Sequence, residues 1–237
     1  MSTASADGGR STGPLTLADV ASLPEPCRGC VRWELGDEGH DAARARGDSA
    51  FEKEAWLSRT LLEWGAAGRV AHEHGALAGF LTYAPPAYVP RSTAMPTSPV
   101  SADAVLLMTG GVLPGHRGTG LGRVLVQGAA KDLTQRGVRA VEAFAARTPE
   151  GAAPSGPPAG RASAAPPAGP LDVPSSRLGG GCLLPAGLLL EVGFEVVRDH
   201  AEVPRLRLEL RTALGWREDV ERALDRILAD VRVPALR

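Results

Sequence analysis

The clearest hydrophobic pattern in the chain lies between Ala104 and Ala145. A continuous apolar run over residues 105–108 predicts a strand that is buried on both faces. From Leu121, apolar residues recur at helical spacing, and Gly137 is placed to end that helix with a positive φ. A second apolar run, over residues 138–144, predicts the next strand. The unit is therefore strand–helix–strand, with two parallel strands and a right-handed crossover.

Weaker patterns on the N-terminal side predict further elements. A first strand is expected at about residues 14–17, and a helix from Ser49 to about Trp64. Residues 69–73 and 77–83 read as a hairpin around His74-Gly75. The charged stretch over residues 36–47 is expected to be a loop, while residues 31–35 fit either an extended segment or the edge of a helix.

Regular patterning resumes late in the chain. A short helix that starts near Pro185 is closed by Gly193, and a strand follows over residues 194–198. Alternating apolar and charged residues predict a partly exposed strand at 206–210. An additional amphipathic helix is expected at about 214–231, where it can cover a sheet edge or join two subunits of a homodimer.

Two segments differ from the rest in composition. Residues 1–13 are small and polar and are expected to be disordered. Residues 149–181 are mostly Pro, Gly, Ala and Ser, with too few large apolar side chains to offset the entropy of ordering them. We interpret them as a disordered insertion in a single domain of residues 14–237; the alternative is a linker between two domains. The 56 residues that follow are too few for an obvious core of their own.

Charge and hydropathy narrow the class of protein. The net charge of −1 argues against a general nucleic-acid binder, which carries a basic face. No apolar run approaches the roughly 20 residues needed to span a bilayer, and the first residues lack the apolar segment of a secretory signal. The sequence therefore predicts a cytoplasmic protein with neither a nucleic acid nor a membrane as partner.

A glycine-rich loop joins the central strand to the central helix. The first turn of a helix carries unpaired N–H groups and a partial charge of roughly +0.5, so it attracts phosphate. Glycines at 118, 120 and 122 let the backbone approach an anion, and Arg117 and Arg123 add positive charge. These features predict a diphosphate site at the start of the helix.

The spacing of these glycines excludes two common nucleotide-binding motifs. A dinucleotide fingerprint counted from Gly118 fails because its sixth position is Arg123, and a P-loop fails because no Lys-Ser or Lys-Thr follows Gly120. The pattern R-x-x-G-x-G is met by Arg117, Gly120 and Gly122. In its setting of strand, Pro114, loop and helix, this pattern resembles the acetyl-CoA motif of the GNAT N-acetyltransferase superfamily; a merely structural glycine-rich turn is the alternative.

The later Gly193-Phe194, at the end of a short helix, resembles the second half of the same superfamily. The resemblance implies an α/β (α+β) fold: a mixed, mostly antiparallel sheet flanked by helices, with a central parallel strand pair that splays apart. It also implies acetyl-CoA as co-substrate, and direct attack on its thioester by an amine of an unidentified small-molecule or peptide acceptor. The implied cofactor-binding residues are Gly111, Val112, Leu113, Arg117, Gly118, Thr119, Gly120, Leu121, Gly122 and Arg123. Among them, the Val112 N–H is the candidate to polarise the thioester carbonyl.

The acid–base groups of this chemistry are less clear. Family members often use a tyrosine, four residues before the Gly-Phe, to protonate the leaving thiolate, but this chain has Leu189 there. Cys182, where the family often has asparagine, is the candidate catalytic acid; the alternative is a small buried apolar residue. Glu34, Glu73 and Glu142 are possible bases. The second functional hypothesis is therefore a non-catalytic acyl-CoA-binding or interaction module of the same fold.

Cys27 and Cys30 form a C-x-x-C pair, which can be a redox pair or half of a zinc site. The zinc interpretation needs two more ligands, and the sequence offers no second pair, so no metal site is predicted. Prolines before Cys27 disfavour the helix start that a redox motif needs. We expect a pair of partly buried thiols, with a thiol-redox protein as the third functional hypothesis.

Overall fold

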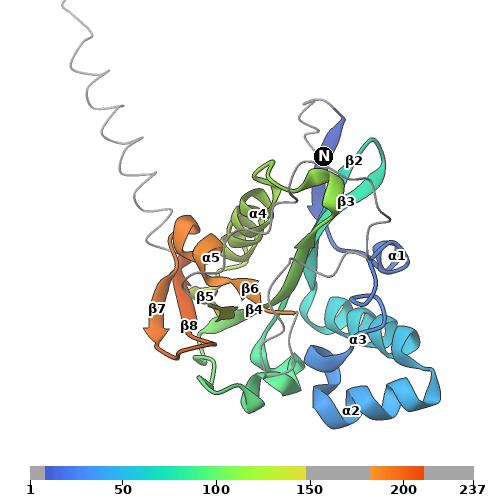
Figure 1. The fold of residues 1–237 in the computed structure, drawn as a ribbon, viewed down its shortest axis with the longest axis horizontal. Coiled ribbons are helices and arrows are strands. Elements are labelled where there is room, and N and C mark those ends of the chain that lie inside the picture. The colour runs from blue at the N-terminus through green and yellow to red at the C-terminus, as the bar shows by residue number, and fades with distance from the viewer. Residues whose placement is uncertain (1–8, 148–181, 211–237) are drawn as a thin grey trace, which may run out of the picture.

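The computed structural model describes residues 9–147 and 182–210 (Figure 1). In this part of the chain, one eight-stranded sheet has the order β1-β2-β3-β4-β5-β8-β7, with β6 beside the end of β5. The pairs β4–β5 and β5–β6 are parallel and the others are antiparallel. The strands are β1 (Arg10–Pro14), β2 (Gly68–Glu73), β3 (Ala76–Ala84), β4 (Ala104–Val112), β5 (Ala140–Ala146), β6 (Leu184–Pro185), β7 (Glu195–Arg198) and β8 (Arg205–Glu209).

Helices cover both faces of this sheet (Figure 1). One face packs on α4 and α5, and the other on α1, α2 and α3. The helices are α1 (Leu17–Val20), α2 (Arg32–Arg46), α3 (Ser49–Trp64), α4 (Leu121–Gln135) and α5 (Ala186–Val192), with 3₁₀ turns at Pro86–Tyr88, Pro90–Ala94 and Pro114–His116. The fold is thus a mixed, mostly antiparallel sheet flanked by helices, as the resemblance implies.

The continuous apolar run in β4 follows from this layering. Successive side chains of a strand point to opposite faces, so a strand covered on both sides needs apolar residues at every position. Val105 and Leu107 pack in the core under α4, while Leu106 and Met108 pack in the core under α1–α3. All four are buried, which confirms the predicted strand.

The parallel pair separates toward its end, as expected. Backbone pairing joins Ala104–Leu107 of β4 to Ala140–Ala143 of β5 and then stops. The last residues of β5, Ala145 and Ala146, pair instead with β6. The second half of β4 therefore keeps β3 as its neighbour on one side and diverges from β5 on the other.

Two expectations about the N-terminal region are wrong. The first strand is Arg10–Pro14 rather than residues 14–17, so residues 10–13 are not disordered. This edge strand is held by backbone pairing to β2 and leaves its small polar side chains at the surface, so it has no hydrophobic signature. Residues 36–47 are not a loop either, because they belong to α2.

The hydrophobic pattern of the sequence does not indicate α2, because little of the helix is buried. Of its 15 residues only Trp33, Glu34, His40 and Ala43 are inside, so no regular apolar stripe marks it. Gly36 interrupts it with φ 73° and ψ 178°, a conformation open essentially only to glycine. The next helix, α3, ends at Trp64 with Gly65 in the left-handed region, as predicted.

Several expectations concern residues outside the described ranges. The disorder of residues 1–8, the insertion at 149–181 and the additional helix at about 214–231 all stay predictions. Strands from both sides of the insertion nevertheless lie in one sheet, where β8 pairs with β5. None of the helices among the described residues has the length and apolar character needed to cross a membrane.

Candidate functional site

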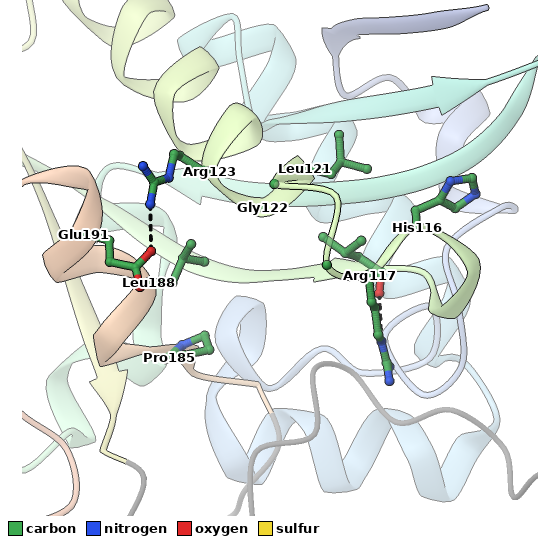
Figure 2. A pocket seen from close by; sticks show the side chains of 11 residues that line it. His116, Arg117, Leu121, Gly122, Arg123, Pro185, Leu188 and Glu191 are labelled. Carbon is green, nitrogen blue, oxygen red and sulfur yellow. Dashed lines mark hydrogen bonds and ion pairs between the residues drawn. The ribbon is translucent and has the colours of Figure 1, made fainter. Parts of the chain in front are cut away.

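The loop between β4 and α4 has the geometry of an anion site (Figure 2). Gly118 and Gly120 lie in the left-handed region, with φ of 74° and 77°, and Thr119 between them does not. Residues of alternating hand turn their N–H groups toward one concave side, which is how backbone nests hold anions. A Cβ added at Gly118 or Gly120 would meet nothing within 4 Å. These glycines are therefore required by the backbone conformation, and the space beside them is open.

The start of α4 adds further N–H groups to this concavity. The first hydrogen bond of the helix runs from the Val124 N–H to the Gly120 carbonyl at 3.2 Å. The amides of residues 121–123 therefore precede the first intrahelical bond and are not used by the helix. With the partial positive charge of a helix N-terminus, they favour a phosphate-sized anion.

A groove of about 440 Å³ opens beside this loop, between the ends of β4, α4 and α5 (Figure 2). Seven residues of the predicted cofactor-binding set line it: Val112, Arg117, Gly118, Gly120, Leu121, Gly122 and Arg123. Sequence reasoning missed four more: His116, Pro185, Leu188 and Glu191. Leu188 and Glu191 lie three residues apart on α5, and Pro185 is its N-cap; this spacing indicates one face of the helix but not what the face lies against.

Three members of the predicted set do not line the groove. Gly111 lies against Phe80 of β3, and a Cβ on it would come within 3.0 Å of the Phe80 ring. Leu113 packs against the core under α1–α3. The Thr119 hydroxyl donates a 2.7 Å hydrogen bond to the His116 carbonyl and so stabilises the loop. Their cofactor-binding roles stay predictions.

The backbone groups of Val112 point away from β3. The N–H of the next residue, Leu113, donates to Ala78 O at 2.9 Å, toward the β3 side. Because adjacent residues of a strand direct their backbone groups to opposite sides, the Val112 N–H and C=O face the splayed side. The Arg117 Nε donates to that carbonyl at 3.3 Å, so Arg117 lies at the junction of groove and strand (Figure 2).

The groove has charges of both signs. Arg123 on α4 reaches across it to Glu191 on α5, with 2.7 Å between Nη2 and Oε2 (Figure 2). His116 at the other end contacts Glu73, with 2.5 Å between Nδ1 and Oε2. Glu191 therefore places a carboxylate beside the cation that the sequence assigns to the diphosphate.

The three candidate bases are all in ion pairs. Glu34 is buried against Lys53. Glu73 contacts His116 and also Arg10. Glu142 is fully buried between Arg205 and Arg207. None of the three is placed as an uncommitted base beside the groove.

Neither Cys182, the candidate acid, nor Leu189, at the position of the family's tyrosine, lines the groove. Leu189, at the position of the family's tyrosine, is fully buried in the core. Cys182 does not line the groove; its thiol interacts with that of Cys30, and this interaction, together with burial, raises the pKa of Cys182. Its role as catalytic acid stays a prediction.

Tyr83 and the C-x-x-C pair do not line the groove. Tyr83 is buried, and its hydroxyl donates to Asp132 at 2.5 Å. Cys27 is buried and Cys30 half-buried, both as free thiols. Within residues 9–147 and 182–210, no group of three or more His, Cys, Asp or Glu side chains is arranged to hold a metal ion.

The model of the acetyltransferase (GNAT) family matches residues 33–153. No curated protein sequence matches the chain.

Similar solved structures are acetyltransferases. The PaiA N-acetyltransferase of Thermoplasma acidophilum, in complex with coenzyme A, has 12% identity and a TM-score of 0.49, over 84% of this chain and 98% of that one. YncA of Salmonella typhimurium, a putative acetyltransferase with acetyl-CoA, has 16% identity and a TM-score of 0.48, over 85% of this chain and 94% of that one. The ribosomal-protein-alanine N-acetyltransferase of Brucella melitensis has 17% identity and a TM-score of 0.46, over 84% of this chain and 99% of that one. The family match spans half of the chain, and the chain therefore belongs to the acetyltransferase (GNAT) family.

Proposed function

We propose that this protein transfers an acetyl group from acetyl-CoA to the amine of an acceptor, by direct attack of the amine on the thioester. The observation that carries the proposal is the concavity of amides at residues 118–123, which opens into the groove beside Val112. Arg117 and Arg123 supply the positive charge that a diphosphate needs. The residues present therefore fit the co-substrate that the family implies.

Each part of the groove has a distinct task in this proposal. When bound, acetyl-CoA supplies an acyl group activated as a thioester. The amides of residues 118–123 hold the diphosphate, and the splayed edge of β4 offers its backbone to the pantetheine. The Val112 N–H stabilises negative charge that develops on the carbonyl oxygen, where a preorganised donor is most effective. The Val112 carbonyl has two lone pairs, so its bond to Arg117 leaves one for a ligand amide.

The proposal is tested with a charge placed in the concavity. Gly120→Glu puts a carboxylate and a side chain where the diphosphate would lie. A ligand at 100 times its Kd stabilises a protein by about 2.7 kcal/mol, which raises Tm by several degrees. We expect saturating acetyl-CoA to stabilise the natural protein in this way and to leave Gly120→Glu unaffected.

Gly137→Glu is the matched control. Gly137 has φ 78° and lies just beyond the other end of α4, so the backbone strain is the same while the groove is untouched. This variant should keep the full response to acetyl-CoA. A response that survives in Gly120→Glu, or is lost equally in both variants, contradicts the site.

For the proton that the leaving thiolate needs, the chain offers Cys182. Its raised pKa keeps the thiol protonated at neutral pH, and the same shift makes it a weaker acid than an ordinary cysteine. In this proposal, Cys182→Ala lowers kcat at least tenfold with little change in Kd for acetyl-CoA, which separates the chemical step from binding. An unchanged kcat removes Cys182 from the mechanism.

Non-catalytic binding of acyl-CoA is the second candidate. It is favoured by the buried Leu189 in place of a tyrosine and by the ion pairs that occupy Glu34, Glu73 and Glu142. The two candidates differ in the release of CoA, measured by chromatography with a panel of amines. Release above the uncatalysed rate supports transfer, whereas stabilisation by acetyl-CoA without release supports a binding module.

A further inference from the structure

The two strands at the ends of the sheet order, β1 and β7, expose different side chains. Within residues 9–147 and 182–210, each of them pairs with one neighbouring strand only (Figure 1). β1 contains Pro14 and otherwise mostly polar residues, which discourage the addition of a further strand. β7 instead has two adjacent valines at its centre, Val196 and Val197, which are 41% and 47% exposed. Because neighbouring residues of a strand point to opposite faces, β7 presents an apolar side chain on both faces of the sheet.

A hollow of about 430 Å³ lies beside this edge strand. Val197 lines it together with Val192 at the end of α5 and with Leu208 and Glu209 at the end of β8. We call these four residues the edge surface. The hollow shares none of its lining residues with the groove beside residues 118–123, so it is separate from the proposed acetyl-CoA site.

The chain leaves the described part of the fold at the edge surface. Glu209 both lines the hollow and ends β8. The next residue, Leu210, is buried, and its N–H donates to the Arg139 carbonyl at 2.9 Å. Residues 211–237 follow directly and lie outside the described ranges. Because Leu210 is held in place, the point from which these residues start is fixed beside the hollow.

The sequence after Leu210 supplies an apolar face that suits this surface. Large apolar residues recur at intervals of three and four, the spacing of one face of a helix: Trp216, Val220, Leu224, Ile227 and Val231. A helix over residues 214–231 would be about 27 Å long, and a strand of four residues spans about 13 Å, so this helix can cover the whole of β7. Isolated helices of this length are only marginally stable in water, so the apolar face needs a surface to pack on.

We propose that residues 214–231 form a helix that packs its apolar face on the edge surface of the same chain. The six steps from Leu210 to Trp216 reach at most about 20 Å, so the segment stays close to the hollow. A short tether of this kind gives an effective concentration in the millimolar range, far above that of a second molecule at micromolar concentration. The occupant is therefore the chain's own segment. Its packing involves no acetyl-CoA and is independent of the proposed acetyl transfer.

Amide hydrogen exchange of the full-length chain at micromolar concentration, followed by mass spectrometry of its peptides, tests this packing. We expect residues 216–231 to exchange at least about tenfold more slowly than an unstructured peptide. Val197→Asp places a charge in the edge surface, and because Val197 is half exposed the core is left intact. This variant should lose the slow exchange of residues 216–231. Leu62→Asp, at an 84% exposed apolar position on α3, is the matched control and should exchange as the natural chain does.

Leu224→Asp tests the same contact from the other side and should speed exchange in residues 195–198 of β7 as well as in residues 216–231. The double variant with Val197→Asp should exchange as either single variant does, because both changes remove one contact. Slow exchange in β4 shows that a variant is folded; if Val197→Asp fails this check, Leu224→Asp decides alone. Fast exchange of residues 216–231 in the natural chain, slow exchange that survives Val197→Asp, or protection that appears only together with a dimer in light scattering would each overturn the proposal.

Discussion

Glu142 is a carboxylate at the centre of the sheet with no exposed surface. Arg205 and Arg207 of β8 contact it at 2.5 and 3.1 Å, and the Ser101 N–H donates to it at 3.1 Å. Burial alone would raise the pKa of Glu142, but these hydrogen bonds and charges outweigh it and hold the pKa below its ordinary value. Glu142 therefore joins β5 to β8 and is not available as a catalytic base.

Glu142→Gln should destabilise the fold by about 3 kcal/mol at pH 7, because two arginines lose the carboxylate that they enclose. The carboxylate's stabilisation is present above its unfolded pKa of about 4.3 and is lost as pH falls through the lower folded pKa. The difference between the two proteins should therefore shrink below about pH 4.3. Urea unfolding at several pH values measures it, with the exposed Glu38→Gln as control. A constant difference at all pH values contradicts the assignment.

The same ion pairs affect which kind of amine can serve as the acceptor. An amine must lose its proton before it attacks, and the candidate carboxylates Glu34, Glu73 and Glu142 are paired with cations. At pH 7 deprotonation costs about 4.6 kcal/mol for a lysine side chain and about 1.4 for an α-amine. The difference corresponds to roughly 200-fold in rate.

We therefore expect alanine amide, which offers an α-amine, to be acetylated about two orders of magnitude faster at pH 7 than Nα-acetyl-lysine amide, which offers only the side-chain amine. The rate with the lysine derivative should rise about tenfold per pH unit up to pH 9. CoA release at saturating acetyl-CoA measures both rates, with Gly120→Glu as the control for uncatalysed reaction. Equal rates at pH 7 would show that the protein supplies a base.

At the residue scale, the sequence is enough to predict which residues of the glycine-rich loop line the groove, but not which residues of α5 line its other side. Gly118, Gly120, Arg117 and Arg123 are adjacent in the chain, so their spacing is enough to indicate a diphosphate site. Glu191 is 68 residues from its partner Arg123. Its place in the groove depends on how α5 packs against α4, which no local pattern records.

The helices α4 and α5 form the two walls of the groove, and the Arg123–Glu191 pair joins them (Figure 2). Both side chains are about half exposed or more, so the pair adds little to stability. Its effect on a ligand is larger, because Glu191 puts a negative charge beside the proposed diphosphate site. Two unit charges 4 Å apart in water interact by about 1 kcal/mol.

Glu191→Gln should therefore bind acetyl-CoA about fivefold more tightly at low salt, and the gain should fall as salt screens the charges. Thermal stability without ligand should change by less than about 0.5 kcal/mol. Titration calorimetry at two salt concentrations measures the effect. Glu195→Gln, on the exposed strand β7, is the control and should bind as the natural protein does. Weaker binding in Glu191→Gln would mean that Glu191 orients Arg123 rather than competing with the ligand.

Prediction of whole elements succeeded where burial was deep and failed where it was shallow. The strands β4 and β5 are buried almost throughout and α4 has one buried face, so their apolar periods are clear in the sequence. The edge strand β1 and the helix α2 bury few side chains, so the sequence predicts the first strand at residues 14–17 and a loop over most of α2. In α2 the polar surface and the break at Gly36 resemble a loop, and the burial of Trp33 and Ala43 helps to stabilise it as a helix.

At the scale of the whole molecule, the two parts of the chain on either side of residues 148–181 depend on each other. β8 pairs with β5 over five residues, and β6 pairs with the end of β5. Leu189, Phe194 and Leu206 from the later part lie in one core with Leu121 and Leu125 of α4. Neither part can complete this core alone.

We therefore expect the long segment to be dispensable for folding and for the groove. Replacing residues 150–179 by a linker of eight Gly and Ser residues keeps the ends of β5 and β6 connected. Since each doubling of loop length costs only about 0.6 kcal/mol, the shortened chain should be as stable as the natural one or about 1 kcal/mol more stable. It should keep its stabilisation by acetyl-CoA, and adding Gly120→Glu should abolish it. Loss of cooperative unfolding in the shortened chain would mean that residues 150–179 contribute to the core, because the sheet on either side would then be unable to close without them.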